Sequence, residues 1–232
     1  NQAGVSKANA VSSGAKVAVA PGTYSLSEAN NGLTWPHGYR WSGLTCSGAS
    51  PTVTQDQTSK AVTSASVAVA KGGNVTCTYT NTANEPKLNL RKTASNAAGN
   101  PLPSGNTLGG EGSLKPGDTL TYTLTFDNAA GSAPIAVSQI DYLRDVLDDA
   151  TYVGNIRYGK LAPTVVAPTT TPLGITAQST NVADLANPRL TFTGPVPAYT
   201  SLTILFDVTL KAIATDWQVR EKGNANATAA PV

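Results

Sequence analysis

Apolar residues alternate with threonine and other polar residues along short segments, and this alternation constrains the fold more than any other feature. The segment Thr119-Leu-Thr-Tyr-Thr-Leu-Thr-Phe-Asp-Asn128 is the clearest case, and residues 202–208 repeat the pattern. Successive side chains of a β-strand point to opposite faces, so the pattern predicts antiparallel strands with one packed face and one wet face. No helical heptad or long helical stripe competes with it. The chain is therefore predicted to be all-β.

Gly, Pro and Asn residues separate these segments and mark the ends of the expected strands. In the N-terminal part they are near residues 16–20, 23–28, 39–46, 64–70 and 74–80. In the C-terminal part they are near residues 88–93, 119–128, 135–142, 151–158, 189–193, 202–210 and 222–229. Residues 162–186, rich in Thr, Pro and Ala, are expected to form an irregular excursion. The short polar segment at residues 84–87 contains a proline and predicts a boundary between two modules, residues 1–85 and 86–232. Both are predicted to be β-sandwiches, Ig-like or prealbumin-like, arranged in tandem.

Composition excludes several classes of function. The net charge is only +2 and no stretch concentrates Lys or Arg, so the electrostatic footprint of a nucleic-acid-binding protein is missing. The longest apolar runs fall far short of the ~20 residues that span a bilayer. The chain contains no methionine, even at its first position, and is therefore expected to be a processed product or a piece of a longer protein.

A search for catalytic or metal-binding patterns finds no convergent set. The single histidine, His37, lies in a predicted turn without a carboxylate or thiol partner nearby in sequence. Nucleophile-elbow, phosphate-loop and zinc-ligand spacings are all missing. The adjacent carboxylates Asp148 and Asp149 are expected to be solvated in a turn. We therefore expect no enzyme, no metal site and no cofactor.

Several ionisable or amide side chains share the apolar face of a predicted strand. The residues at alternate positions, which share one face of a strand, form three groups: Tyr24, Leu26 and Glu28; Val75, Cys77, Tyr79 and Asn81; and Leu88, Leu90 and Lys92. An ammonium aimed at a core is costly unless it is paired or neutralised. The two cysteines, Cys46 and Cys77, also lie in strand-like segments of one module, where either a disulfide or two buried thiols would fit.

Residues 21–29, Pro-Gly-Thr-Tyr-Ser-Leu-Ser-Glu-Ala, followed by Gly38-Tyr39, resemble the CnaB-type (SpaA-like, prealbumin-like fold) modules of bacterial pilins and adhesins. The segments around the cysteines resemble a cystine-bearing subgroup, which implies a Cys46–Cys77 disulfide. Residues 88–229 resemble the repeat called DUF11 in surface proteins. The matching pieces are Leu-Arg-Lys-Thr at 90–93, Lys-Pro-Gly-Asp-Thr-Leu-Thr-Tyr-Thr-Leu-Thr-Phe-Asp-Asn at 115–128, Asp-Val-Leu-Asp-Asp-Ala-Thr-Tyr-Val at 145–153 and Gly-Asn-Ala-Asn-Ala-Thr at 223–228.

The resemblance implies a self-formed isopeptide bond, which many such modules carry between Lys and Asn, promoted by a buried acid. In the second module it points to Lys92 on the first strand and to Asn224 or Asn226 on the last. Asp145 is the family-matched acid and Asp141 is its competitor. In the alternative interpretation, Lys92 lies at a sheet margin and its ammonium reaches water.

The first module offers the family-matched acid, Glu28, and the family-matched amide, Asn81, but no recognisable lysine-bearing first strand. Lys7 and Lys16 lie closer to Glu28 than the family layout suggests. Three interpretations stay open. The module has no bond, its first strand precedes Asn1 in a longer precursor, or a neighbouring molecule supplies the strand.

The combined expectation is an extracellular, structural stalk or filament segment at a bacterial cell surface. Its expected partners are other copies or flanking repeats of the same surface protein. The alternative is an adhesin domain that binds a host protein, a glycan or another cell-surface ligand. That alternative rests on the 162–186 excursion and on the aromatic residues Trp35, Tyr39 and Trp41.

Overall fold

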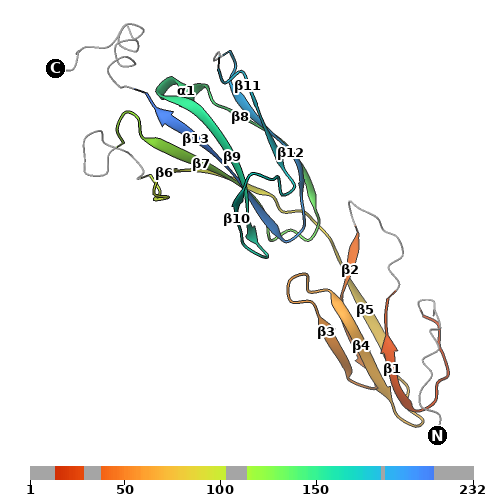
Figure 1. The fold of residues 1–232 in the computed structure, drawn as a ribbon. Helices are drawn as coiled ribbons and strands as arrows, with labels where there is room; N and C mark the ends of the chain where they lie inside the picture. The colour runs from red at the N-terminus through yellow and green to blue at the C-terminus, as the bar shows by residue number, and fades with distance from the viewer. Residues whose placement is uncertain (1–13, 29–37, 103–113, 184–185, 212–232) are drawn as a thin grey trace, which may run out of the picture. The chain divides into compact units, whose positions relative to one another are not determined.

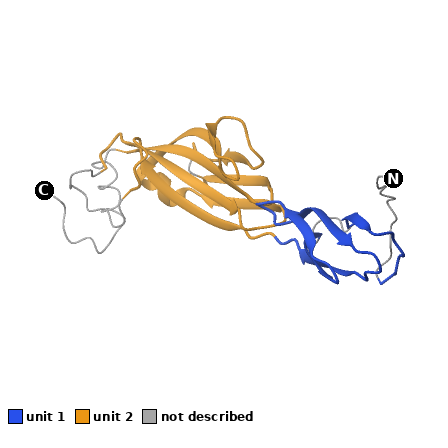
Figure 2. Ribbon diagram, turned by 90° about the horizontal axis from the view of Figure 1, so that it is seen from below, with its two compact units in different colours: residues 1–85 blue, residues 86–232 orange. Residues whose placement is uncertain are grey.

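A computed structural model describes residues 14–28, 38–102, 114–183 and 186–211. The chain divides into two compact units, Asn1–Glu85 and Pro86–Val232, which Figure 2 distinguishes by colour. Antiparallel strands dominate both units, and a single short helix occurs among the described residues. The predicted all-β, sandwich-type fold is confirmed.

Unit 1 (residues 1–85) contains two small antiparallel sheets, seen in Figure 1. Its strands are β1 (Gly22–Leu26), β2 (Tyr39–Ser47), β3 (Pro51–Gln55), β4 (Val62–Val69) and β5 (Thr76–Ala83). One sheet has the order β1-β4-β3 and the other pairs β2 with β5. The described hydrophobic residues that are buried in this unit are Leu44, Ala65 and Val67. The apolar core that the described residues of this unit form is therefore small.

Unit 2 (residues 86–232) is a larger sandwich of two antiparallel sheets. The five-stranded sheet has the order β10-β9-β13-β7-β6, and the three-stranded sheet has the order β11-β12-β8. Its elements are β6 (Asn89–Asn96), β7 (Thr119–Asn128), β8 (Ile135–Tyr142), α1 (Arg144–Asp149), β9 (Ala150–Ala162), β10 (Val166–Thr169), β11 (Thr176–Thr180), β12 (Arg189–Val196) and β13 (Thr200–Leu210). The observed bounds of β7 and β8 equal the predicted ones.

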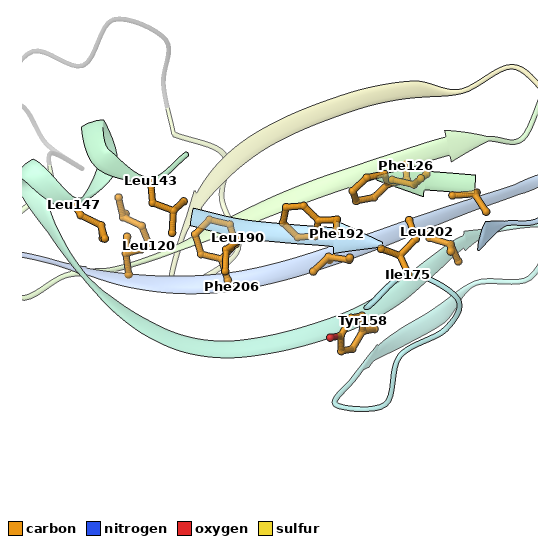
Figure 3. Packing of buried hydrophobic residues seen from close by; sticks show 14 of the residues in the cluster. Leu120, Phe126, Leu143, Leu147, Tyr158, Ile175, Leu190, Phe192, Leu202 and Phe206 are labelled. Atoms are coloured by element: carbon orange, nitrogen blue, oxygen red, sulfur yellow. The ribbon is translucent and has the colours of Figure 1, made fainter. Parts of the chain in front are cut away.

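The core of unit 2 lies between its two sheets (Figure 3). Phe126 from β7, Phe192 from β12 and Phe206 from β13 are fully enclosed there. Leu202, Ile204 and Val208 fill alternate positions of β13 on the same face, as the sequence pattern predicts. Each fully buried side chain of this kind contributes about 1.5–3 kcal/mol of transfer free energy. The core therefore holds the two sheets together.

Some predicted elements are wrong. Residues 16–20 form no strand, and Val17 and Val19 remain 49% and 46% exposed. Strand β3 was not predicted, and the supposedly irregular residues 162–186 contain β10 and β11. Asp148 and Asp149 end the helix α1, where a turn was expected. The predicted strand at residues 222–229 lies outside the described residues.

Candidate crosslinking sites

The strands β2 and β5 of unit 1 are joined by a disulfide. Cys46 and Cys77 are directly opposite each other in the β2–β5 register and form this bond. The two strands form the smaller sheet of the unit. The disulfide therefore adds a covalent link to the hydrogen bonds and the Trp41–Tyr79 ring contact between these strands.

The carboxylate and amide matched by family resemblance in unit 1 lie in contact. Asn81 Nδ2, on β5, donates a hydrogen bond to Glu28 Oε1 at 2.7 Å. Trp41 is the residue opposite Asn81 on β2, and its ring centroid lies 5.2 Å from that of Tyr79. Burial raises the pKa of Tyr79, and the negative charge of Glu28 raises it further. The acid and the amide therefore lie beside two aromatic rings.

A lysine is missing from this arrangement within the described part of unit 1. Neither Glu28 nor Asn81 forms an ion pair or hydrogen bond with a lysine there. Lys16 is exposed, and Lys7 lies outside the described residues. Glu28 and Asn81 are themselves exposed to solvent.

Lys92 in unit 2 connects the two sheets through an ion pair. Its Nζ, on β6, donates to Asp141 Oδ1 on β8 at 2.9 Å and lies 2.8 Å from Oδ2. The same Nζ lies 4.7 Å from the ring centroid of Tyr122 and 5.8 Å from that of Phe206. Burial raises the pKa of Tyr122, and Asp141 adds to the effect through its charge. The ammonium is thus held between a carboxylate and two aromatic rings.

Asp141, not Asp145, is the acid that touches Lys92. Asp145 lies in the first turn of α1 with its side chain exposed. The Lys92 side chain is 33% exposed, whereas that of Asp141 is 16% exposed. Lys92 therefore sits at the margin of the sandwich and not deep in its core. Asn224 and Asn226, the predicted amide partners, lie outside the described residues.

Sequence reasoning missed a buried polar cluster around Asp207 of β13. Its carboxylate accepts hydrogen bonds from Arg157 Nη1 at 2.7 Å and Nη2 at 2.8 Å, from Asn155 Nδ2 at 2.6 Å and from Thr121 Oγ1 at 2.8 Å. The Arg157 guanidinium is the main cause of a lowered pKa for Asp207. The only signal in the sequence was a carboxylate within a strongly apolar strand, out of phase with its core residues.

Asn128 is a second buried polar residue that was not singled out. Its side chain is fully enclosed, and Oδ1 accepts from the backbone N–H of Lys87 at 2.8 Å. Its Nδ2 donates to the carbonyl of Ala133 at 2.9 Å and to that of Pro197 at 3.0 Å. One amide therefore ties the first residues of unit 2 to two of its turns.

The described residues offer little for small-molecule chemistry. They contain no group of three or more His, Cys, Asp or Glu side chains placed to hold a metal ion. The hollow beside Tyr158, Ile175 and Leu202 has no room for a water molecule. His37 lies outside the described residues. Within the same part of the chain, no helix is long and apolar enough to cross a membrane.

Comparison with known families gives two matches. Residues 1–83 match a prealbumin-like fold domain of the SpaA type. Residues 109–230 match a domain of unknown function, DUF7927. The second match is to a different family from DUF11, so the predicted likeness to DUF11 repeats is not confirmed. Comparisons with curated proteins and with solved structures give no significant match.

Proposed function

We propose, on the premise that the chain belongs to the DUF7927 family and carries a prealbumin-like module, that it is a structural segment of a bacterial cell-surface stalk or filament. SpaA-type prealbumin-like domains are structural and not catalytic, which supports this reading. The proposed location is extracellular, at the bacterial surface. The proposed partners are flanking repeats or other copies of the same protein, including copies that associate by strand addition.

The contact that carries this proposal is the Lys92–Asp141 pair, because it places an amine and an acid together at the margin where both sheets end. In the described part of the chain, β8 pairs only with β12, and β6 pairs with β7 and forms one further bridge, from Ser95 to Pro101. A further strand carrying Asn224 or Asn226 would add to this margin and bring a carboxamide to the amine. Tyr122 and Phe206 would exclude water from the site.

The proposed bond forms by displacement of ammonia. The neutral amine of Lys92 attacks the carboxamide carbon of Asn224 or Asn226, and the new C–N bond replaces the bond to the amide nitrogen. Asp141 first takes a proton from the Lys92 ammonium, which leaves the amine neutral. It then polarises the carbonyl, passes this proton to the departing nitrogen so that ammonia leaves, and accepts the proton lost by the attacking nitrogen; Asp145 is the alternative acid. Fixed proximity supplies the rate, since well-oriented groups reach effective molarities of ~10⁵ M or more. The step occurs once and uses no outside substrate, so it is self-processing.

Intact mass under reducing and non-reducing conditions tests the proposal. The wild-type chain should weigh one ammonia less than the mass of its sequence. The Lys92→Arg and Asp141→Asn variants should each have the full mass of their own sequence. Lys160→Arg, which changes a lysine of β9, should leave the ammonia loss unchanged. Tandem mass spectrometry should locate the crosslinked asparagine. A wild-type mass equal to the sequence mass, with no crosslinked peptide, would reject the bond in unit 2.

An adhesin role is the second candidate, and the tip of the β9–β10 hairpin favours it. Leu161 is 52% exposed, Val165 is 72% exposed and Val166 is 38% exposed in this hairpin. Of the aromatic residues that suggested binding, Trp41 packs on Tyr79, and Tyr39 is half exposed. Trp35 lies outside the described residues. Saturable binding of the isolated chain to a host protein or glycan, lost in a Val165→Ser variant, would favour the adhesin.

A further inference from the structure

The segment at residues 162–172 is rich in Thr, Pro and Ala and belongs neither to the core nor to the crosslinking sites. It contains four threonines and three prolines, and it repeats the tripeptide Ala-Pro-Thr at residues 162–164 and 167–169. No charged residue occurs in the sequence between Lys160 and Asp184. Segments rich in Thr and Pro are typical acceptors of O-linked sugars in extracellular stalks. The composition therefore indicates a modification site, provided that the fold leaves the hydroxyl groups accessible.

The fold anchors this segment at both of its ends. Val166 and Thr169 of β10 pair with Lys160 and Tyr158 of β9, and β10 is the end strand in the order of the five-stranded sheet (Figure 1). Shortly after the segment, Ile175 is buried in the core of unit 2. The threonines are therefore presented by the folded sandwich at defined positions.

Three of the four threonines lie at the two ends of β10 with their side chains in solvent. Thr164 lies in the turn between β9 and β10, Thr170 and Thr171 directly follow β10, and all three are exposed. Within the described part of the chain, their hydroxyl groups form no hydrogen bond. Thr169 differs, because it is half-buried and its Oγ1 accepts a hydrogen bond from the Thr171 N–H at 3.3 Å. The three exposed hydroxyl groups can therefore be substituted without the loss of a hydrogen bond.

Exposed apolar side chains accompany these threonines. Val165, the neighbour of Thr164, is 72% exposed, and Leu161 is 52% exposed. Apolar side chains on an exposed strand favour association with other chains. Sugars on the neighbouring threonines would cover them, because a glycan is bulky, increases solubility and lies at the surface. The modification would therefore meet a physical need of this hairpin.

We propose that Thr164, Thr170 and Thr171 are acceptor sites for O-linked sugars, which a glycosyltransferase attaches at the two ends of β10. The sugars cover the apolar side chains of the hairpin and keep copies of the chain from associating there. This inference rests on the proposed extracellular function, and it adds a modification that the crosslinking chemistry does not involve.

The transfer balances with one co-reactant, a phosphate-activated sugar. Oγ1 of the threonine attacks the anomeric carbon of the sugar and forms a new C–O bond. The bond from the anomeric carbon to the phosphate oxygen breaks, and its electron pair leaves with the phosphate group. The proton of the hydroxyl group passes to a base of the transferase. Nothing is oxidised or reduced in this step.

Peptide mapping of the chain recovered from the cells that encode it tests the proposal. Trypsin cuts after Lys160 and Arg189, so the three acceptor threonines fall in one peptide, residues 161–189. We expect this peptide to exceed its sequence mass by a whole number of sugar residues, and electron-transfer fragmentation should place them on the three exposed threonines. The same peptide from a chain made in the cytoplasm of a laboratory host should have its sequence mass. The peptide does not contain Lys92, so a crosslink in unit 2 does not affect the readout.

A variant made in the same cells supplies the second measurement. Replacement of Thr164, Thr170 and Thr171 together by alanine should abolish the mass excess of peptide 161–189. Thr52→Ala is the matched control, because Thr52 is exposed and also follows a proline but pairs with Ser66 inside the sheet of unit 1. It should leave the mass excess unchanged.

The wild-type map decides the outcome even where the triple variant fails to fold. Peptide 161–189 at its plain sequence mass, in chain recovered from the cell surface, would overturn this inference and leave the proposed structural function standing. Sugars placed on other residues of the peptide would overturn it as well. Recovery of the chain from the cytoplasm alone would overturn both proposals.

Discussion

Asp207 illustrates how a charged side chain is tolerated inside a strand. Its residue is only 7% exposed, and both carboxylate oxygens are occupied by donors from β7 and β9. Arg157 supplies a bidentate pair, the geometry in which a charge-assisted hydrogen bond is strongest. The outer face of the central strand is therefore held by a polar cluster, whereas the inner face is held by aromatic packing.

The free energy of unfolding of unit 2 should depend on pH through the titration of Asp207. Its pKa lies below the ordinary value of 3.8, chiefly because of Arg157. A lowered folded-state pKa means that the carboxylate stabilises the fold above the unfolded-state value and loses this contribution as the pH falls through the folded-state value. Asp207→Asn should lower the free energy of unfolding at pH 7 by about 1–3 kcal/mol and flatten its decline below pH ~4.

Urea denaturation at several pH values measures this effect. Asp127→Asn on β7 is the control, because Asp127 accepts a hydrogen bond only in an exposed turn. It should change the unfolding free energy by less than ~1 kcal/mol. Equal losses for the two variants at pH 7 would contradict the role given to the Arg157–Asp207 pair.

Replacing Asn128 should destabilise unit 2 strongly. Asn128→Ala leaves the Lys87 N–H and two turn carbonyls without their buried partner, which should cost about 2–4 kcal/mol. Gly131→Ala should act in the same direction, since a Cβ there would collide with Asn128 Oδ1 and the Lys87 nitrogen. Thermal unfolding measures both. Asn89→Ala, at an exposed position of β6, should remain near wild type.

At the scale of elements, alternation predicted strands well where the strand has two neighbours or a long apolar face. β7 shows this, since both its neighbours and its core face enforce the pattern. Residues 16–20 have the right composition but no ladder partner among the described residues, so propensity alone did not make a strand. β3, β10 and β11 were missed because they are short and carry proline or mostly polar residues. The helix α1 spans only six residues, too few for a periodic signal.

The disulfide should stabilise unit 1 specifically. The bond closes a sequence separation of 31 residues between adjacent strands. Replacing Cys46 and Cys77 together by alanine should lower the unfolding free energy of this unit by about 2–4 kcal/mol, mainly by freeing the unfolded chain. Hydrogen exchange of β2 and β5 should accelerate, while exchange of β7 and β13 serves as the internal control. Unchanged exchange in β2 and β5 would contradict this assignment.

At the scale of the whole molecule, family resemblance and geometry contributed different parts of the candidate sites. Resemblance selected Glu28 and Asn81, which lie in contact. It ranked Asp145 above Asp141, although only Asp141 touches Lys92. The parity of β8 carried the missing signal, since Asp141 falls four residues after the buried Val137 on the same face. The Asp207 and Asn128 networks depend on contacts distant in sequence, which no local pattern reveals.

Single-molecule pulling of the full chain from its two ends tests the central claim. The claim is that the chain carries mechanical load and that a bond between its own side chains keeps unit 2 from extending. A bond from Lys92 to Asn224 or Asn226 would prevent the residues between them from extending, so unit 2 should add almost no length under load. The Lys92→Arg chain should instead release about 3.5 Å for each residue of that stretch. The same release in the wild-type chain would contradict the account.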